Sequence, residues 1–91
     1  MEKVRKHIVF TGRVKGVGFR YHASYAARGL GITGWVQNNP DGSVEMEVEG
    51  SEIQINQMLT MIHRDSYIRI DDMDIKNIPL QEQELRFRVR G

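Results

Sequence analysis

The amino-acid sequence predicts an α+β sandwich of the ferredoxin-like, split βαβ kind, in which two helices cover one face of an antiparallel sheet. Apolar residues recur at helical spacing in two segments and alternate with polar residues in five others. These segments follow one another as strand, helix, strand, strand, helix and strand, with one more short strand at the end. Amphipathic strands fit such a sheet, because one of its faces stays in water.

The first half of the chain contains one expected strand and one expected helix. The strand covers residues 4–14, in which Ile8 and Phe10 share one face. Glycines at positions 12, 16 and 18 then end the strand in a loop. The helix runs from Phe19 to Gly31, where a glycine suits the left-handed position that follows a helix. Its apolar stripe consists of Phe19, Ala23, Ala26, Ala27 and Leu30.

The second half begins with a hairpin over residues 33–49, whose turn is formed by Asn39-Pro40-Asp41-Gly42. A capping box of Ser51 and Gln54 starts the second helix. Further strands are expected over residues 67–76, before the break at Pro79, and over residues 85–90. In the second hairpin strand, Glu45, Glu47 and Glu49 are expected to face water. The apolar stripe of the second helix consists of Ile55, Met58, Leu59 and Ile62.

Composition restricts what the chain can do. Its 91 residues suffice for a single domain, 1–91. A formal charge of +1 is too small to predict nucleic-acid binding. The absence of cysteine excludes disulfides, thiolate chemistry and cysteine-based zinc sites. No signal peptide and no membrane-spanning segment are recognisable, so we expect a free-standing cytoplasmic protein, monomeric by default and without membrane partners.

The loop between the first strand and the first helix is the strongest candidate for chemistry. Its glycines allow a sharp turn, and a helix N-terminus offers unpaired N–H groups and a partial positive charge. Together these features favour phosphate binding. Arg20, at the start of the helix, is suited to clamp two phosphate oxygens. The alternative is a glycine-rich connector beside an exposed arginine.

Two common phosphate motifs do not explain this loop. Gly12 and Gly16 are spaced wrongly for a Walker loop, and no Lys-Ser or Lys-Thr pair follows them. A dinucleotide-like pattern occurs at Gly29-Leu30-Gly31-Ile32-Thr33-Gly34. It follows a helix and precedes a strand, which reverses the required order, so we interpret it as a helix cap and a loop.

Two blocks of the sequence resemble the acylphosphatase family. Residues Gly12 to Arg20 are similar to its signature G-R-V-Q-G-V-x-F-R, with Lys15 in place of glutamine. Residues Gly34 to Val44 are similar to G-W-V-x-N-x-x-x-G-x-V. The resemblance extends over essentially the whole chain, although Tyr67 to Ile70 match only loosely.

This resemblance implies hydrolysis of small-molecule acyl phosphates to a carboxylate and inorganic phosphate, without metal or cofactor. It implies that Arg20 is catalytic and that Asn38 orients the attacking water. Without the resemblance, the turn preference of asparagine explains Asn38. From Lys15 we expect only a mild effect on substrate choice. The implied phosphate-binding loop consists of Lys15, Gly16, Val17, Gly18, Phe19 and Arg20.

Other functions were weighed against this one. An RNA-binding module shares the order of elements, but its aromatic motif belongs in the third strand, which here carries Val, Met and Glu. A non-catalytic phosphate-binding domain remains an alternative. The histidines (7, 22 and 63) are dispersed without metal spacing, and His22 is expected on the helix surface. Asp71, Asp72 and Asp74 fit a solvated strand edge, and Trp35 fits packing in the core or on the sheet.

Overall fold

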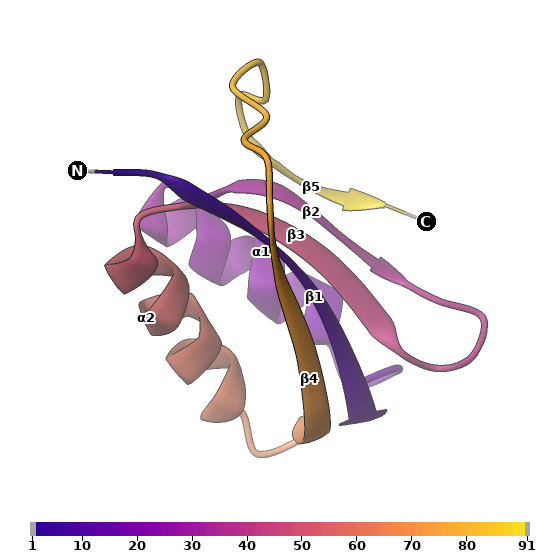
Figure 1. The fold of residues 1–91 in the computed structure, drawn as a ribbon. Helices are drawn as coiled ribbons and strands as arrows, with labels where there is room; N and C mark the ends of the chain where they lie inside the picture. The colour runs from indigo at the N-terminus through magenta and orange to yellow at the C-terminus, as the bar shows by residue number, and fades with distance from the viewer. Residues whose placement is uncertain (1, 91) are drawn as a thin grey trace.

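The computed structural model describes residues 2–90 and contains two helices beside one five-stranded sheet (Figure 1). The helices are α1 (Phe19–Leu30) and α2 (Glu52–His63). The strands are β1 (Val4–Arg13), β2 (Thr33–Asn38), β3 (Val44–Gly50), β4 (Arg69–Ile78) and β5 (Phe87–Arg90).

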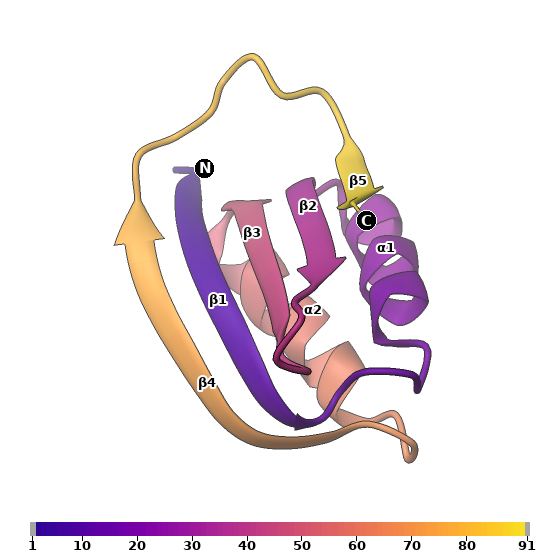
Figure 2. The ribbon, with the colours of Figure 1, turned by 90° about the vertical axis from the view of Figure 1, so that its right-hand side faces the viewer.

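The sheet has the strand order β4-β1-β3-β2-β5, and both helices lie on the same face of it (Figure 2). Strands β1 to β4 pair antiparallel with one another, as the split βαβ arrangement requires. The predicted fold class is therefore confirmed. One pairing differs from the expectation of an antiparallel sheet, because β5 runs parallel to β2. A long connection from β4 carries the chain across to that edge (Figure 2).

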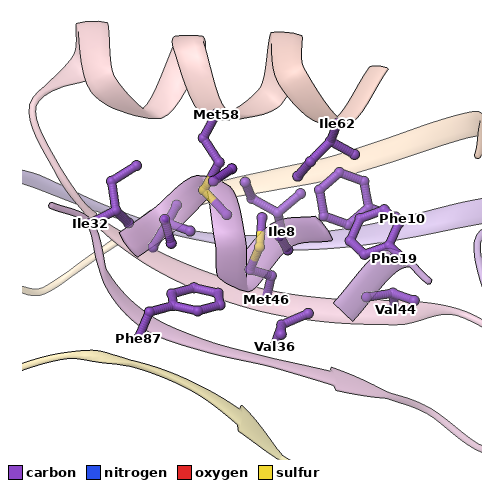
Figure 3. Packing of buried hydrophobic residues seen from close by; sticks show 14 of the residues in the cluster. Ile8, Phe10, Phe19, Ile32, Val36, Val44, Met46, Met58, Ile62 and Phe87 are labelled. Carbon is purple, nitrogen blue, oxygen red and sulfur yellow. The ribbon is translucent and has the colours of Figure 1, made fainter. Parts of the chain in front are cut away.

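The hydrophobic core fills the space between the sheet and the helices (Figure 3). Strand residues at alternate positions meet the apolar stripes of both helices, which the sequence periods predict. The first stripe is buried except for Leu30, and the second except for Leu59; both of these leucines are partly buried. Fully buried side chains that Figure 3 labels include Ile8, Phe10, Val36, Val44, Met46, Met58 and Ile62.

The helix ends follow the sequence signals closely. Gly31 adopts a left-handed φ of 72°, and the N–H of Ile32 donates to the carbonyl of Ala27 (2.9 Å), which closes α1. The dinucleotide-like pattern is thus structural, with its last glycine, Gly34, inside β2 rather than in a loop. At Gly34 a side chain would collide with the backbone of Glu47, so the close strand pairing explains this glycine.

The predicted boundaries of two strands are wrong by two residues. Strand β4 covers Arg69–Ile78 rather than 67–76, because Asp65 accepts a hydrogen bond from the N–H of Tyr67 (2.8 Å) and holds a turn there. It ends directly before Pro79, which cannot donate to the ladder. Strand β5 covers Phe87–Arg90, and the N–H of Gly34 bonds the carbonyl of Arg86 just before it.

The open face of the sheet carries a buried ion-pair cluster that the sequence analysis missed. Arg5 is only 2% exposed and contacts Glu47 (2.9 Å), Glu49 (3.1 Å) and Glu84 (2.8 Å). Glu49 also accepts the N–H of Gln81 (2.7 Å), which ties the β4–β5 connection to the sheet. The prediction that Glu49 faces water is therefore wrong, because this connection covers it. No helix of the described residues is long and apolar enough to cross a membrane.

Candidate active site

The loop between β1 and α1 ends in an uncapped helix N-terminus. Gly16 (φ 75°) and Gly18 (φ 81°) adopt left-handed conformations that other residues rarely take. Gly18 is the N-cap of α1, and no side chain caps this end by a hydrogen bond. The first turn of α1 contains no acidic residue. Because the first N–H groups of a helix have no partner within the helix, this terminus is suited to bind an anion.

Phe19 and Arg20 play different parts at the start of α1. Phe19 is 2% exposed and packs its ring against Phe10, with 4.8 Å between the ring centroids. This contact anchors the first turn of the helix to β1. Arg20, the next residue, is half-buried and lines the surface cleft beside the loop. The core thus fixes the backbone at the start of α1, from which the side chain of Arg20 extends.

A cleft of about 420 Å³ lies at this helix end. Three parts of the chain line it: the loop with the first turn of α1, the end of β2, and β5. The lining residues are Val14, Lys15, Gly16, Gly18, Phe19, Arg20, Tyr21, Asn38 and Val89. Of the residues predicted for the site, only Val17 is not among them; it packs, partly buried, against the core.

Asn38, the last residue of β2, lies in the same cleft as the loop. Its side-chain oxygen Oδ1 is buried and accepts no hydrogen bond from the described residues. An unsatisfied buried acceptor costs about 1–3 kcal/mol, so its presence needs a reason.

The turn that follows Asn38 is held by its own residues. Asn39 donates its backbone N–H to the carbonyl of Ser43 (2.8 Å) and its Nδ2 to Ser43 Oγ (3.0 Å). Asp41 accepts hydrogen bonds from the backbone N–H (2.9 Å) and the hydroxyl (2.6 Å) of Ser43. Since Asn39, Asp41 and Ser43 make the turn contacts, the turn preference of asparagine does not explain Asn38.

Electrostatics near the cleft are dominated by cations. Lys15 and Arg20 line it, and none of the lining residues among 2–90 is acidic. Asp41, in the β2–β3 turn, lies close enough to feel the charge of Lys15. Hydrogen bonds from Ser43 lower the pKa of the Asp41 carboxyl, and the positive charge of Lys15 adds to this effect. An anionic ligand therefore meets favourable charge on the loop side of the cleft.

Three lining residues were not predicted from the sequence: Val14, Tyr21 and Val89. Val14 directly follows β1, and Tyr21 lies on the first turn of α1, where it is 79% exposed. Both are neighbours of the loop in the sequence, so their place beside it could have been predicted. Val89 comes from β5, which reaches the cleft only because that strand pairs with β2. No local sequence signal predicts that contact.

His22 does not line the cleft, and it is not simply a surface residue. Its Nδ1 lies 3.2 Å from Asp65 Oδ2, and its Nε2 lies 3.2 Å from the carbonyl oxygen of Met61. It connects α1 to the end of α2. Among residues 2–90, no group of three or more histidine or acidic side chains could hold a metal ion, and Asp71, Asp72 and Asp74 are exposed as predicted.

Comparisons with known proteins show the family to which the chain belongs. The acylphosphatase family model matches residues 6–89. The acylphosphatase of Geobacillus kaustophilus is 40% identical over 93% of this chain and 92% of its own length. That of Bifidobacterium longum is 45% identical over 96% and 92%. The crystal structure of the Bacillus subtilis acylphosphatase superimposes with a TM-score of 0.88 at 29% identity, over 97% of this chain and 99% of that one. The chain therefore belongs to the acylphosphatase family and is an acylphosphate-hydrolysing enzyme.

Proposed function

We propose that the cleft at the start of α1 is the active site, where loop N–H groups and Arg20 hold the phosphoryl group and Asn38 orients the attacking water. One observation carries the proposal: Asn38, whose buried Oδ1 has no hydrogen-bond partner among the described residues, lines the same cleft as an uncapped helix N-terminus. The first feature calls for a donor and the second for an anion. A water molecule beside a phosphoryl group supplies both.

The phosphoryl group binds at the loop end of the cleft. Phosphate oxygens accept hydrogen bonds from backbone N–H groups of residues 15–20, and the helix dipole adds attraction. The planar guanidinium of Arg20 contacts two further oxygens. Because a phosphoryl-transfer transition state spreads charge over its equatorial oxygens, these donors stabilise it more than the ground state.

Asn38 positions the nucleophile. Its Oδ1 accepts one O–H of a water molecule, which turns a lone pair of that water toward phosphorus. The hydrogen-bonded turn from Asn39 to Ser43 keeps the backbone of Asn38 in place. Orientation of this kind lowers the barrier by removing the need to find the reactive geometry in solution.

The reaction needs no metal in this proposal. The water oxygen forms a bond to phosphorus, and the bond between phosphorus and the acyl oxygen breaks. The electron pair of that bond leaves with the carboxylate, while a phosphoryl oxygen takes the proton of the water. A carboxylate is a stable leaving group, so no general acid is required.

We propose further that the chain acts as a single-domain, monomeric, cytoplasmic enzyme on small molecules. The formal charge of +1 supports a small substrate rather than nucleic acid.

The direct test is hydrolysis of benzoyl phosphate by protein that has been treated with EDTA. We expect phosphate release well above the uncatalysed rate, with the same rate before and after EDTA. Phosphate binding without any release would support a non-catalytic phosphate-binding domain instead. A loss of release on EDTA treatment that a divalent cation restores would refute the metal-free mechanism.

A further inference from the structure

We propose that Lys15 gives the enzyme a preference for acyl phosphates whose acyl group itself carries a negative charge. This preference rests on the proposed function of the cleft, since it concerns the part of the substrate that leaves the phosphoryl group. It identifies a specificity-determining residue and a substrate class within that site.

The first observation is a surplus of positive charge. The phosphoryl group is served by the backbone of the loop and by Arg20. Lys15 adds a second cationic side chain to the lining of the cleft, in which the described part of the chain places no acidic residue. Lys15 is exposed, so a ligand from solvent can reach it.

The second observation is that Lys15 is not neutralised by a direct partner. Within residues 2–90 its ammonium makes no ion pair and no hydrogen bond. Asp41 is close enough for the charge of Lys15 to act on it, but its carboxylate is held by two hydrogen bonds from Ser43. Both of these bonds end on Asp41 Oδ1, and the ammonium of Lys15 forms no ion pair with this carboxylate, so it is available to a ligand.

The third observation concerns two further lining residues. Tyr21 and Val89 line the cleft and carry no charge. A neutral acyl group gains nothing from the charge of Lys15, whereas an acyl carboxylate is attracted to its ammonium. Exposed ion pairs are modest, so we expect a contribution of about three- to five-fold in kcat/KM.

The experiment compares benzoyl phosphate with 4-carboxybenzoyl phosphate, a rigid pair that differs by one carboxylate. The measured quantity is the ratio of kcat/KM for the charged substrate to kcat/KM for the neutral one. Any effect of Lys15 on the phosphoryl group changes both values alike and cancels in the ratio. Lys15→Gln removes the charge, Lys15→Glu reverses it, and Lys76→Gln removes an exposed lysine on β4, away from the cleft.

We expect Lys15→Gln to lower the ratio about three- to five-fold and Lys15→Glu to lower it further, while Lys76→Gln leaves it unchanged. In the unmodified enzyme, the ratio falls as salt is raised, because ions screen an exposed pair. A ratio that is the same in all four proteins would overturn this inference alone. Hydrolysis of neither substrate by the unmodified enzyme would instead refute the proposed function.

Discussion

The two helices of this fold begin in opposite ways. At the start of α2, Ser51 Oγ accepts the N–H of Gln54 (3.1 Å), and the Gln54 side chain accepts the N–H of Ser51 (3.1 Å). Glu52 adds a negative charge to that first turn. At the start of α1, Gly18 offers no side chain, and the first turn has no acid. One helix end is closed by the chain itself, and the other is open to a ligand.

This difference separates stability from function within one architecture. Compared with glycine, a serine N-cap is worth only a few tenths of a kcal/mol, so the open end of α1 forgoes little of the stability that α2 retains. The same vacancy leaves N–H donors and a partial positive charge available to phosphate. Because the two helices lie side by side on one sheet (Figure 1), their ends provide matched positions for testing this account.

Arg20→Ala, at the open end of α1, is expected to have the largest effect on activity. We expect kcat/KM for benzoyl phosphate to fall by about 10³-fold, because the transition state loses its charged donor. Inorganic phosphate should also inhibit much more weakly. The matched control is Arg28→Ala, in the last turn of α1, which should retain full activity. Equal activity of the two variants would contradict the assignment of Arg20.

Asn38→Ala should separate binding from turnover. We expect kcat to fall by about 10²-fold, since water is no longer oriented. The inhibition constant of inorganic phosphate should stay within about two-fold of the original, because the loop donors and Arg20 remain. Steady-state kinetics with phosphate as inhibitor measures both quantities. Unchanged kcat would remove Asn38 from the mechanism.

Gly18→Ala and Ser51→Ala test the two helix ends directly. Each should lower the free energy of unfolding by about 1 kcal/mol, the first through left-handed strain and the second through a lost cap. Only Gly18→Ala should also raise KM, because it displaces the loop N–H groups. Urea unfolding and kinetics on the same samples give the comparison. A rise in KM for Ser51→Ala that matches Gly18→Ala would contradict it.

The smallest effect concerns Glu45 on the open face of the sheet. The hydrogen bond from His7 (2.7 Å) and the charge of His7 lower the pKa of this carboxyl below its usual 4.5. The pair therefore stabilises the fold above about pH 4.5, and this contribution disappears as pH falls through the lower folded-state pKa. Both side chains are about one quarter exposed, so we expect less than 1 kcal/mol.

The measurement is urea unfolding at pH values from about 3 to 6, for the original protein and for Glu45→Gln. The stability difference between them should shrink toward acid pH. Activity at neutral pH should be equal, because Glu45 does not line the cleft. A difference that stays constant over this range would show that the pair contributes nothing through charge.

Most of the fold was predictable because local patterns and tertiary packing agree. The stripe that begins at Phe19 and the alternation of Val44, Met46 and Val48 fixed the elements. The capping box at Ser51 is present as predicted. The direction of β5 was not predictable, because a four-residue alternating segment carries no signal for its partner strand.

Part of the site was predictable, because some of its residues are adjacent in the sequence. The glycines and Arg20 are neighbours in sequence, so one loop indicated the phosphate site. Asn38 and Val89 reach the cleft through strand pairing, and only the family resemblance singled out Asn38. Arg5 was missed because a charged residue on an open sheet face is normally solvated; here the connection through Glu84 covers it.

The central claim is that water held by Asn38 attacks phosphorus in the cleft at the open end of α1. Hydrolysis of benzoyl phosphate in ¹⁸O-labelled water tests it most directly. Mass spectrometry then shows which product carries the label. The account predicts ¹⁸O in inorganic phosphate and none in benzoate. Label in benzoate would mean that water attacks the acyl carbon, and would contradict the roles assigned to Arg20 and Asn38.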